Sequence, residues 1–154
     1  MATLLIVHHT PSPATHTLLE AVRAGANDPQ IRGVDVVVRA ALEATAVDVL
    51  AADGYLLGTP ANLGYMSGAL KHFFDQIYYP CLDATFGRPF GLWVHGNNDT
   101  GGAVLAVEKI TTGLKWRAAQ LPLSVVGDPT TADLDAGWEL GAALGATLAE
   151  DLGP

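Results

Sequence analysis

Apolar residues along the chain form two kinds of pattern that alternate from one end to the other. Short, nearly continuous apolar runs are typical of strands that are covered on both faces of a sheet. Longer segments whose apolar residues recur every three or four positions are typical of helices that bury one side. Strands are predicted at residues 4–7, 34–38, 55–58, 90–94 and 121–126.

The clearest helix follows the third predicted strand. Its apolar residues have the spacing i, i+4, i+7, i+8 and i+11, and they are Met66, Leu70, Phe73, Phe74 and Ile77. Other helices are predicted over residues 18–26, 47–51, 103–116 and 134–148. Strands that alternate with helices predict an α/β three-layer sandwich with a five-stranded parallel sheet, most often of order 2-1-3-4-5. No linker divides residues 1–154, so we expect a single domain.

The composition narrows the classes of ligand. Of the 154 residues, 49% are hydrophobic and 16% are charged, the opposite of the balance in a disordered chain. The net charge of −8 argues against nucleic acid and anionic membranes as partners. The single cysteine cannot form an internal disulfide, and no apolar run approaches the ~20 residues of a membrane span. Because residues 1–7 carry no basic leader, we expect a cytoplasmic protein.

Three predicted loops meet at one edge of this sheet. In a sheet of order 2-1-3-4-5, ligands bind beyond the carboxyl ends of the strands, where the order reverses. The loops at this edge span residues 8–16, 58–67 and 95–102, and all three are rich in small and polar residues. We therefore expect the functional site at this edge.

The first of these loops has two interpretations. Thr10, Ser12 and Thr15 lie just ahead of a predicted helix, where hydroxyl and N–H groups can hold an anion. A phosphate here would be held by dipoles alone, since no Lys or Arg lies within residues 1–22. The alternative is an ordinary helix start, with Ser12 as the N-cap and Pro13 in the first turn.

The other two loops favour a ligand over plain turns. Residues 58–67 contain glycine, proline and asparagine, which give a tight backbone that a flat ligand can approach closely. Residues 95–102 place small residues and amides ahead of a helix. Two such loops at one edge, with a hydroxyl-rich loop between them, predict a binding site.

These loops resemble those of a known family. Residues 10–15 resemble the flavodoxin phosphate loop, which reads Ser/Thr-x-Thr-Gly-x-Thr. Residues 58–60, continuing through 66–75, resemble the matching segment of flavodoxin-like NAD(P)H-dependent FMN reductases and quinone oxidoreductases. Gly101 and Gly102 resemble their third flavin loop. The resemblance runs from residue 1 to about residue 126 and implies the flavodoxin-like form of the three-layer sandwich.

The resemblance implies FMN as a non-covalent cofactor held by all three loops. The residues that would hold its phosphate are Thr10, Ser12, Ala14, Thr15 and His16. The residues that would line its isoalloxazine ring are Pro60, Ala61, Asn62, Leu63 and Gly64 on one side and Asn97, Asn98, Asp99 and Gly102 on another. The chain departs from the family pattern at Pro13, which replaces a glycine, and Pro11 also lacks an N–H.

Aromatic residues distinguish an electron carrier from a reductase. Flavodoxins that only carry electrons resemble one another in sandwiching the flavin between aromatic side chains, whereas the second loop has only Tyr65 and the third has none. An uncovered flavin face leaves room for NAD(P)H, and hydride transfer needs that contact. We therefore expect an FMN-dependent NAD(P)H oxidoreductase that reduces a quinone-like or other small acceptor, and the family resemblance suggests a homodimer. The alternatives are a non-enzymatic flavodoxin-type carrier and a flavodoxin-like domain that has lost its flavin.

Two further residues are candidates for chemistry at this edge. His95 ends the fourth predicted strand and is the candidate catalytic proton donor, the alternative being a hydrogen-bonded histidine at a strand end. Arg88 is the candidate partner for the 2′-phosphate of NADPH, and the sequence does not choose between NADH and NADPH. No metal is expected, because there is no His-x-x-x-His spacing or cluster of acidic ligands.

Overall fold

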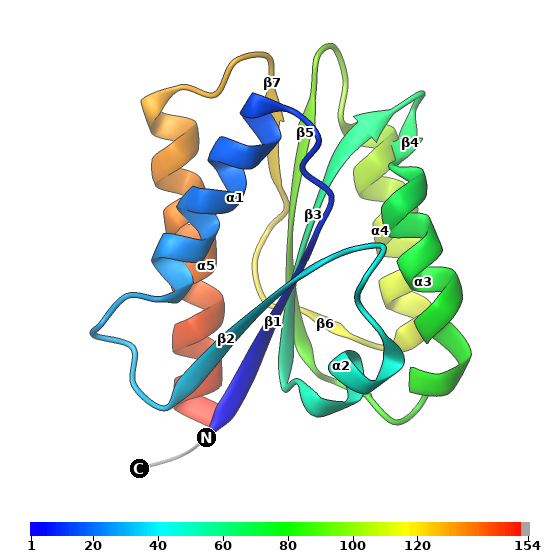
Figure 1. The fold of residues 1–154 in the computed structure, drawn as a ribbon, viewed down its shortest axis with the longest axis vertical. Coiled ribbons are helices and arrows are strands. Elements are labelled where there is room, and N and C mark those ends of the chain that lie inside the picture. The colour runs from blue at the N-terminus through cyan, green and yellow to red at the C-terminus, as the bar shows by residue number, and fades with distance from the viewer. Residues whose placement is uncertain (152–154) are drawn as a thin grey trace.

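A computed structural model describes residues 1–151 and shows one sheet between two layers of helices (Figure 1). The parallel strands are β1 (Ala2–His8), β2 (Val34–Ala40), β3 (Gly54–Asn62), β5 (Pro89–Gly96) and β7 (Leu123–Val126). They pair in the spatial order β2-β1-β3-β5-β7. This confirms the predicted α/β fold and the order 2-1-3-4-5, with the reversal between β1 and β3.

The helices divide between the two faces of the sheet. Helices α1 (Pro13–Ala26) and α5 (Thr131–Asp151) cover one face, and α2 (Ala46–Ala51), α3 (Gly68–Cys81) and α4 (Gly101–Leu114) cover the other (Figure 1). Successive residues of a strand point to opposite faces, so each central strand contributes to two separate cores. In β1, Leu4 and Ile6 join the core under α1 and α5, whereas Leu5 and Val7 join the core under the other three helices.

Two short strands depart from the prediction. Met66, predicted as the first apolar residue of a helix, lies in β4 (Tyr65–Met66), which folds back antiparallel onto β3. Helix α3 begins later because the Ser67 side chain caps it by accepting a hydrogen bond from the Leu70 N–H. The predicted start of the fifth strand at residue 121 is also wrong: Leu121 is exposed, and a separate strand β6 (Arg117–Ala118) precedes β7 beside β5.

At the amino ends of the strands, a buried network joins α2 to the sheet. The Trp116 ring stacks on Tyr55 with 4.1 Å between ring centroids, and its Nε1–H donates to Thr85 Oγ1 at 2.8 Å. The Tyr55 hydroxyl donates to the Val49 carbonyl at 2.6 Å. The Arg88 guanidinium donates to the carbonyls of Val49, Leu50 and Ala52, which end α2, and to the Tyr55 hydroxyl. This network satisfies carbonyl groups that a helix end leaves without partners.

We expect the Tyr55 hydroxyl to make the fold sensitive to alkali. Burial raises the pKa of Tyr55 to about 12, from 10.0, although the Arg88 hydrogen bond opposes the shift. The folded chain therefore keeps a proton that the unfolded chain loses. The stability that the neutral Tyr55 hydroxyl contributes is present below pH 10 and is lost between pH 10 and about 12. The free energy of unfolding, measured in urea, should fall by roughly 2 to 3 kcal/mol across this pH range. The loss should be smaller in Tyr55→Phe, and an equal loss in both proteins would contradict the assignment.

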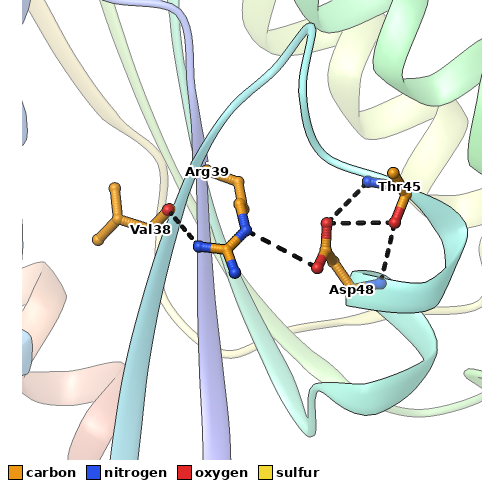
Figure 2. Close-up of polar contacts among 4 residues, drawn as sticks. All are labelled: Val38, Arg39, Thr45 and Asp48. Carbon is orange, nitrogen blue, oxygen red and sulfur yellow. Dashed lines mark hydrogen bonds and ion pairs between the residues drawn. The ribbon is translucent and has the colours of Figure 1, made fainter.

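The carboxyl end of β2 is tied to α2 by polar side chains, as Figure 2 shows. Thr45 and Asp48 cap the helix reciprocally, because each side chain accepts a hydrogen bond from the other residue's N–H. The Arg39 Nε lies 3.8 Å from the Asp48 carboxylate, and its Nη1 donates to the Val38 carbonyl (Figure 2). These bonds position the intervening residues 40–44, which approach the end of β1.

Candidate functional site

A cavity of about 360 Å³ lies at the reversal of the strand order, beyond the carboxyl ends of the strands. All three predicted loops contribute to it. Its lining consists of Pro11, Ser12, Pro13, Ala14, Pro60, Ala61, Asn62, His95, Gly96, Asn97 and Asp128. Loops distant in sequence therefore form one site, as the parallel topology predicts.

The first loop is an ordinary capped helix start that also leaves donors free. The Ser12 N–H donates to Thr15 Oγ1 at 3.0 Å, and the Thr15 N–H donates to Ser12 Oγ at 3.2 Å. Pro13 occupies the first turn, as predicted. Within residues 1–151 the N–H groups of Thr10 and Ala14 have no hydrogen-bond partner. The loop can thus cap α1 and still offer N–H groups to an anion.

The second loop is a hairpin whose tip projects away from the cavity. Strands β3 and β4 are joined by Leu63 and Gly64, whose φ angles of 51° and 77° both lie in the left-handed region. Such a pair gives the two-residue turn whose twist matches the strands. Leu63 is fully exposed at this tip and does not line the cavity, whereas Pro60, Ala61 and Asn62 do.

The second and third loops contact each other through two glycines. A Cβ atom on Gly102 would overlap the backbone of Gly64, so the two segments pack at a distance that only glycine permits at this position. Neither residue lines the cavity itself. Their contact positions the loops that do line it.

The third loop brings a buried histidine into the cavity. His95 is only 7% exposed, and its Nε2 lies 2.8 Å from the Gly127 carbonyl oxygen. Because a carbonyl only accepts, Nε2 carries the hydrogen, and Nδ1 of the neutral ring has a free lone pair. Asn97 also lines the cavity, whereas Asn98 and Asp99 are exposed beyond it. The Asp99 carboxylate accepts from the Gly101 N–H at 2.9 Å and so shapes the start of α4.

Three residues predicted at the phosphate end do not line the cavity. Thr10 lines a neighbouring cavity, where its hydroxyl lies 3.1 Å from His8 Nδ1. Thr15 is buried by the helix cap, and His16 is exposed on α1. Asp128, which sequence reasoning missed, does line the cavity. It follows β7, so the rule that selected the other loops would also have selected this one.

Arg88 is not at this site. It directly precedes β5 and therefore lies at the amino ends of the strands, opposite the cavity. Its guanidinium is also engaged by the carbonyls that end α2. The prediction that Arg88 meets a 2′-phosphate is therefore wrong, and no Lys or Arg lines the cavity.

Two other findings concern the described residues as a whole. Residues 1–151 contain no group of three or more His, Cys, Asp or Glu side chains arranged to hold a metal ion. None of the helices in this part of the chain combines the length and the apolar character needed to cross a bilayer.

Comparison with known proteins identifies the family. The sequence profile described as "NADPH-dependent FMN reductase" matches residues 25–130, more than half of the chain. The chain belongs to this family. It is accordingly a flavodoxin-like protein of an FMN-binding family, as its loops predicted.

Individual relatives of this FMN reductase family member include a flavodoxin and a probable quinone dehydrogenase by name. A flavodoxin of Aquifex aeolicus (strain VF5) is 36% identical over 77 residues, which cover 50% of this chain and 40% of the relative. A probable NAD(P)H dehydrogenase (quinone) FQR1-like 2 of Arabidopsis thaliana is 28% identical over 97 residues, which cover 62% of this chain and 32% of the relative. The matches thus span less than half the length of these curated relatives.

Solved structures show the same fold over nearly the whole chain. A flavodoxin, WrbA-like protein from Agrobacterium tumefaciens has a TM-score of 0.78 at 19% identity, covering 98% of this chain and 99% of that structure. A flavodoxin from the domain Archaea has a TM-score of 0.81 at 17% identity, covering 96% and 99%. At these identities the likeness concerns the fold.

Proposed function

We propose that this chain is an FMN-dependent oxidoreductase that takes electrons from NAD(P)H and reduces a quinone-like or other small acceptor. The observation that carries the proposal is the lining of the cavity, which contains no aromatic side chain apart from the His95 imidazole. A flat ring bound there would keep one face open to a second flat molecule. Tyr65 is half exposed on β4 and does not line the cavity.

The residues around the cavity fit FMN. At one end, the free N–H group of Ala14 and the Ser12 side chain lie at the start of α1, where the helix dipole favours an anion. At the other end, the backbone around Pro60, Ala61 and Asn97 offers an uncharged surface for a heterocycle. Bound FMN supplies a ring that accepts a hydride and passes electrons to an acceptor.

The remaining predicted residues have supporting roles in this proposal. Thr15 and His16 hold the first turn of α1, while Leu63 and Gly64 form the turn that sets the height of the second loop. Asn98, Asp99 and Gly102 shape the third loop rather than contact the ring.

We assign His95 the catalytic role. Its Nε2–H is committed to the Gly127 carbonyl, so the ring is fixed and Nδ1 is the atom that can accept or deliver a proton in the cavity. The Asp128 carboxylate lines the same cavity. This role concerns the acceptor side, because hydride transfer itself needs no proton donor.

A non-enzymatic electron carrier is the second candidate, and the match to a flavodoxin favours it. The two candidates differ in their access to small molecules. A carrier would exchange electrons with a protein partner and would not turn over NAD(P)H.

The test is reconstitution followed by steady-state kinetics. Added FMN should give a flavin absorbance spectrum, and NADH or NADPH should then be oxidised in the presence of a benzoquinone.

His95→Gln should lower the quinone-dependent rate by roughly tenfold or more. His72→Gln, on the exposed side of α3, is the matched control and should have no effect. A yellow protein that oxidises neither nicotinamide would overturn the reductase and favour the carrier, and a protein that takes up no FMN would overturn both. Sedimentation of the reconstituted protein would test the expected homodimer.

A further inference from the structure

The residue that follows β7 is held to β5 at both of its polar backbone groups. The Gly127 N–H donates to the Gly96 carbonyl at 2.9 Å, and the Gly127 carbonyl accepts from the His95 Nε2–H at 2.8 Å. The first bond extends the ladder in which Gly96 pairs with Val126. The second bond comes from a side chain, so the end of β7 is joined to β5 through the backbone and through the candidate catalytic ring.

Gly127 makes both bonds in a left-handed backbone conformation. Its φ angle is 79°, a value that residues with a side chain seldom adopt and that β-branched residues strongly disfavour. A Cβ atom at this position would meet nothing within 4 Å, so the conformation rather than the space calls for glycine. The φ angle sets the direction of the Gly127 carbonyl relative to its N–H group. At a negative φ, a residue whose N–H stayed on Gly96 would turn its carbonyl away from His95.

The His95 ring depends on this carbonyl for its orientation. Within residues 1–151 the Gly127 carbonyl is the only hydrogen-bond partner of the ring. The side chain is almost fully buried, yet its Nδ1 has no partner there and is open to solvent rather than sealed in the core. Loss of the Gly127 bond would leave the Nε2–H without a partner, and the ring would be free to turn or to move its hydrogen to Nδ1.

We propose that Gly127 is a positioning residue for His95, whose left-handed backbone holds the Nε2–H and keeps Nδ1 available to the cavity. The inference rests on the proposed function, in which His95 serves the acceptor side. In that role Nδ1 takes up one proton from solvent and passes it to an oxygen of the acceptor. The ring then returns to the same neutral form, with the Nε2–H bond to Gly127 unchanged. Gly127 itself does not line the cavity.

The kinetic test compares Gly127→Val with Gly127→Asn in the FMN-reconstituted protein. Valine disfavours the left-handed conformation, whereas asparagine tolerates it. Gly127→Val should lower the quinone-dependent rate about fivefold, because a misplaced proton donor slows the step that it serves. Reduction of the bound flavin by NADH or NADPH, measured by stopped flow, should keep its wild-type rate. Gly127→Asn should retain at least about half of the quinone-dependent rate.

Gly87→Val is the matched control for this strain. Gly87 also has a left-handed φ, of 75°, and a Cβ atom there would also meet nothing within 4 Å. Its N–H likewise donates to a backbone carbonyl, that of Lys115. It lies just before β5, at the amino ends of the strands and away from the cavity. Gly87→Val should therefore lose stability in urea as Gly127→Val does, but keep the wild-type rate with the quinone.

Proton NMR tests the contact itself and needs neither flavin nor nicotinamide. In the wild-type protein the buried, hydrogen-bonded Nε2–H of His95 should give a low-field signal that exchanges slowly with water. His95→Gln should identify this signal by removing it. The signal should persist in Gly127→Asn and in Gly87→Val, and it should disappear in Gly127→Val.

Three results would overturn the role of Gly127. The first is a Gly127→Val protein that keeps the low-field signal, and the second is one that loses the signal but reduces the quinone at the wild-type rate. The third is an equal fall in rate when Gly127→Val is added to His95→Gln, because the loss would then not pass through the ring. A wild-type protein that binds FMN but oxidises neither nicotinamide would instead overturn the proposed function, and the NMR signals would then decide alone whether Gly127 holds His95.

Discussion

Replacing Gly102 with valine should abolish FMN binding, raising the Kd by a hundredfold or more. The Cβ atom of any other residue at this position would overlap the Gly64 backbone, so the third loop must move away from the hairpin. That movement displaces Asn97 relative to Ala61, and both residues line the cavity. Overpacking against backbone also costs about 1–3 kcal/mol in unfolding free energy. Flavin fluorescence titration and urea unfolding measure the two effects.

The neighbouring glycine provides the control for this prediction. A Cβ atom on Gly101 would meet only the Asp99 carboxylate, at 3.4 Å, which is an ordinary contact. Gly101→Ala should therefore bind FMN with an affinity within about twofold of wild type. If Gly102→Val bound FMN as tightly as Gly101→Ala, the contact between the loops would not control the site.

The largest loss of stability is expected at Gly58. This residue pairs with Trp93 across β3 and β5, and the Trp93 ring covers it so closely that a Cβ atom would lie among the ring atoms. Trp93 is fully buried in the core under α1 and α5, so its ring cannot move aside. Gly58→Ala should lower the free energy of unfolding by about 3 kcal/mol, a large share of the total for a domain of this size.

Two further variants separate this overlap from a general glycine effect. Gly68→Ala adds the same methyl group at the first residue of α3, where nothing lies within 4 Å, and should be neutral or slightly stabilising. Trp93→Leu removes the ring that Gly58→Ala would strike, so the double variant should lose less than the sum of the two single changes. Strict additivity in urea unfolding would contradict the proposed overlap.

The parallel fold was predictable because its strands carry uninterrupted apolar runs. Residues such as Leu4 to Val7 are buried on both faces, and only a sheet covered by two helical layers requires this. The strand order then placed three loops at one edge, and the structure brings Ser12, Pro60 and His95 around one cavity there. The roles of these residues toward FMN stay a prediction.

The errors arose where tertiary contacts override local pattern. Met66 has helical spacing with later apolar residues, but pairing with Ala61 draws it into β4. Arg88 follows soon after residues 66–75, which resemble the flavin-binding family, in the sequence. It directly precedes β5, however, so the topology places it at the amino ends of the strands, opposite the cavity. No side chain fits at Gly58 or Gly102, because atoms of Trp93 and Gly64 occupy the space that a Cβ atom would need. The spacing of apolar residues along the sequence does not reveal such contacts.

The Arg88–Tyr55–Trp116 network and the edge proposed to bind FMN occupy opposite ends of the same strands. The buried network therefore stabilises the end of the sheet at which no chemistry is proposed. Substitution of the exposed Leu63 side chain at the hairpin tip should consequently leave the stability of this scaffold unchanged, provided that the Gly64 backbone beside Gly102 is kept.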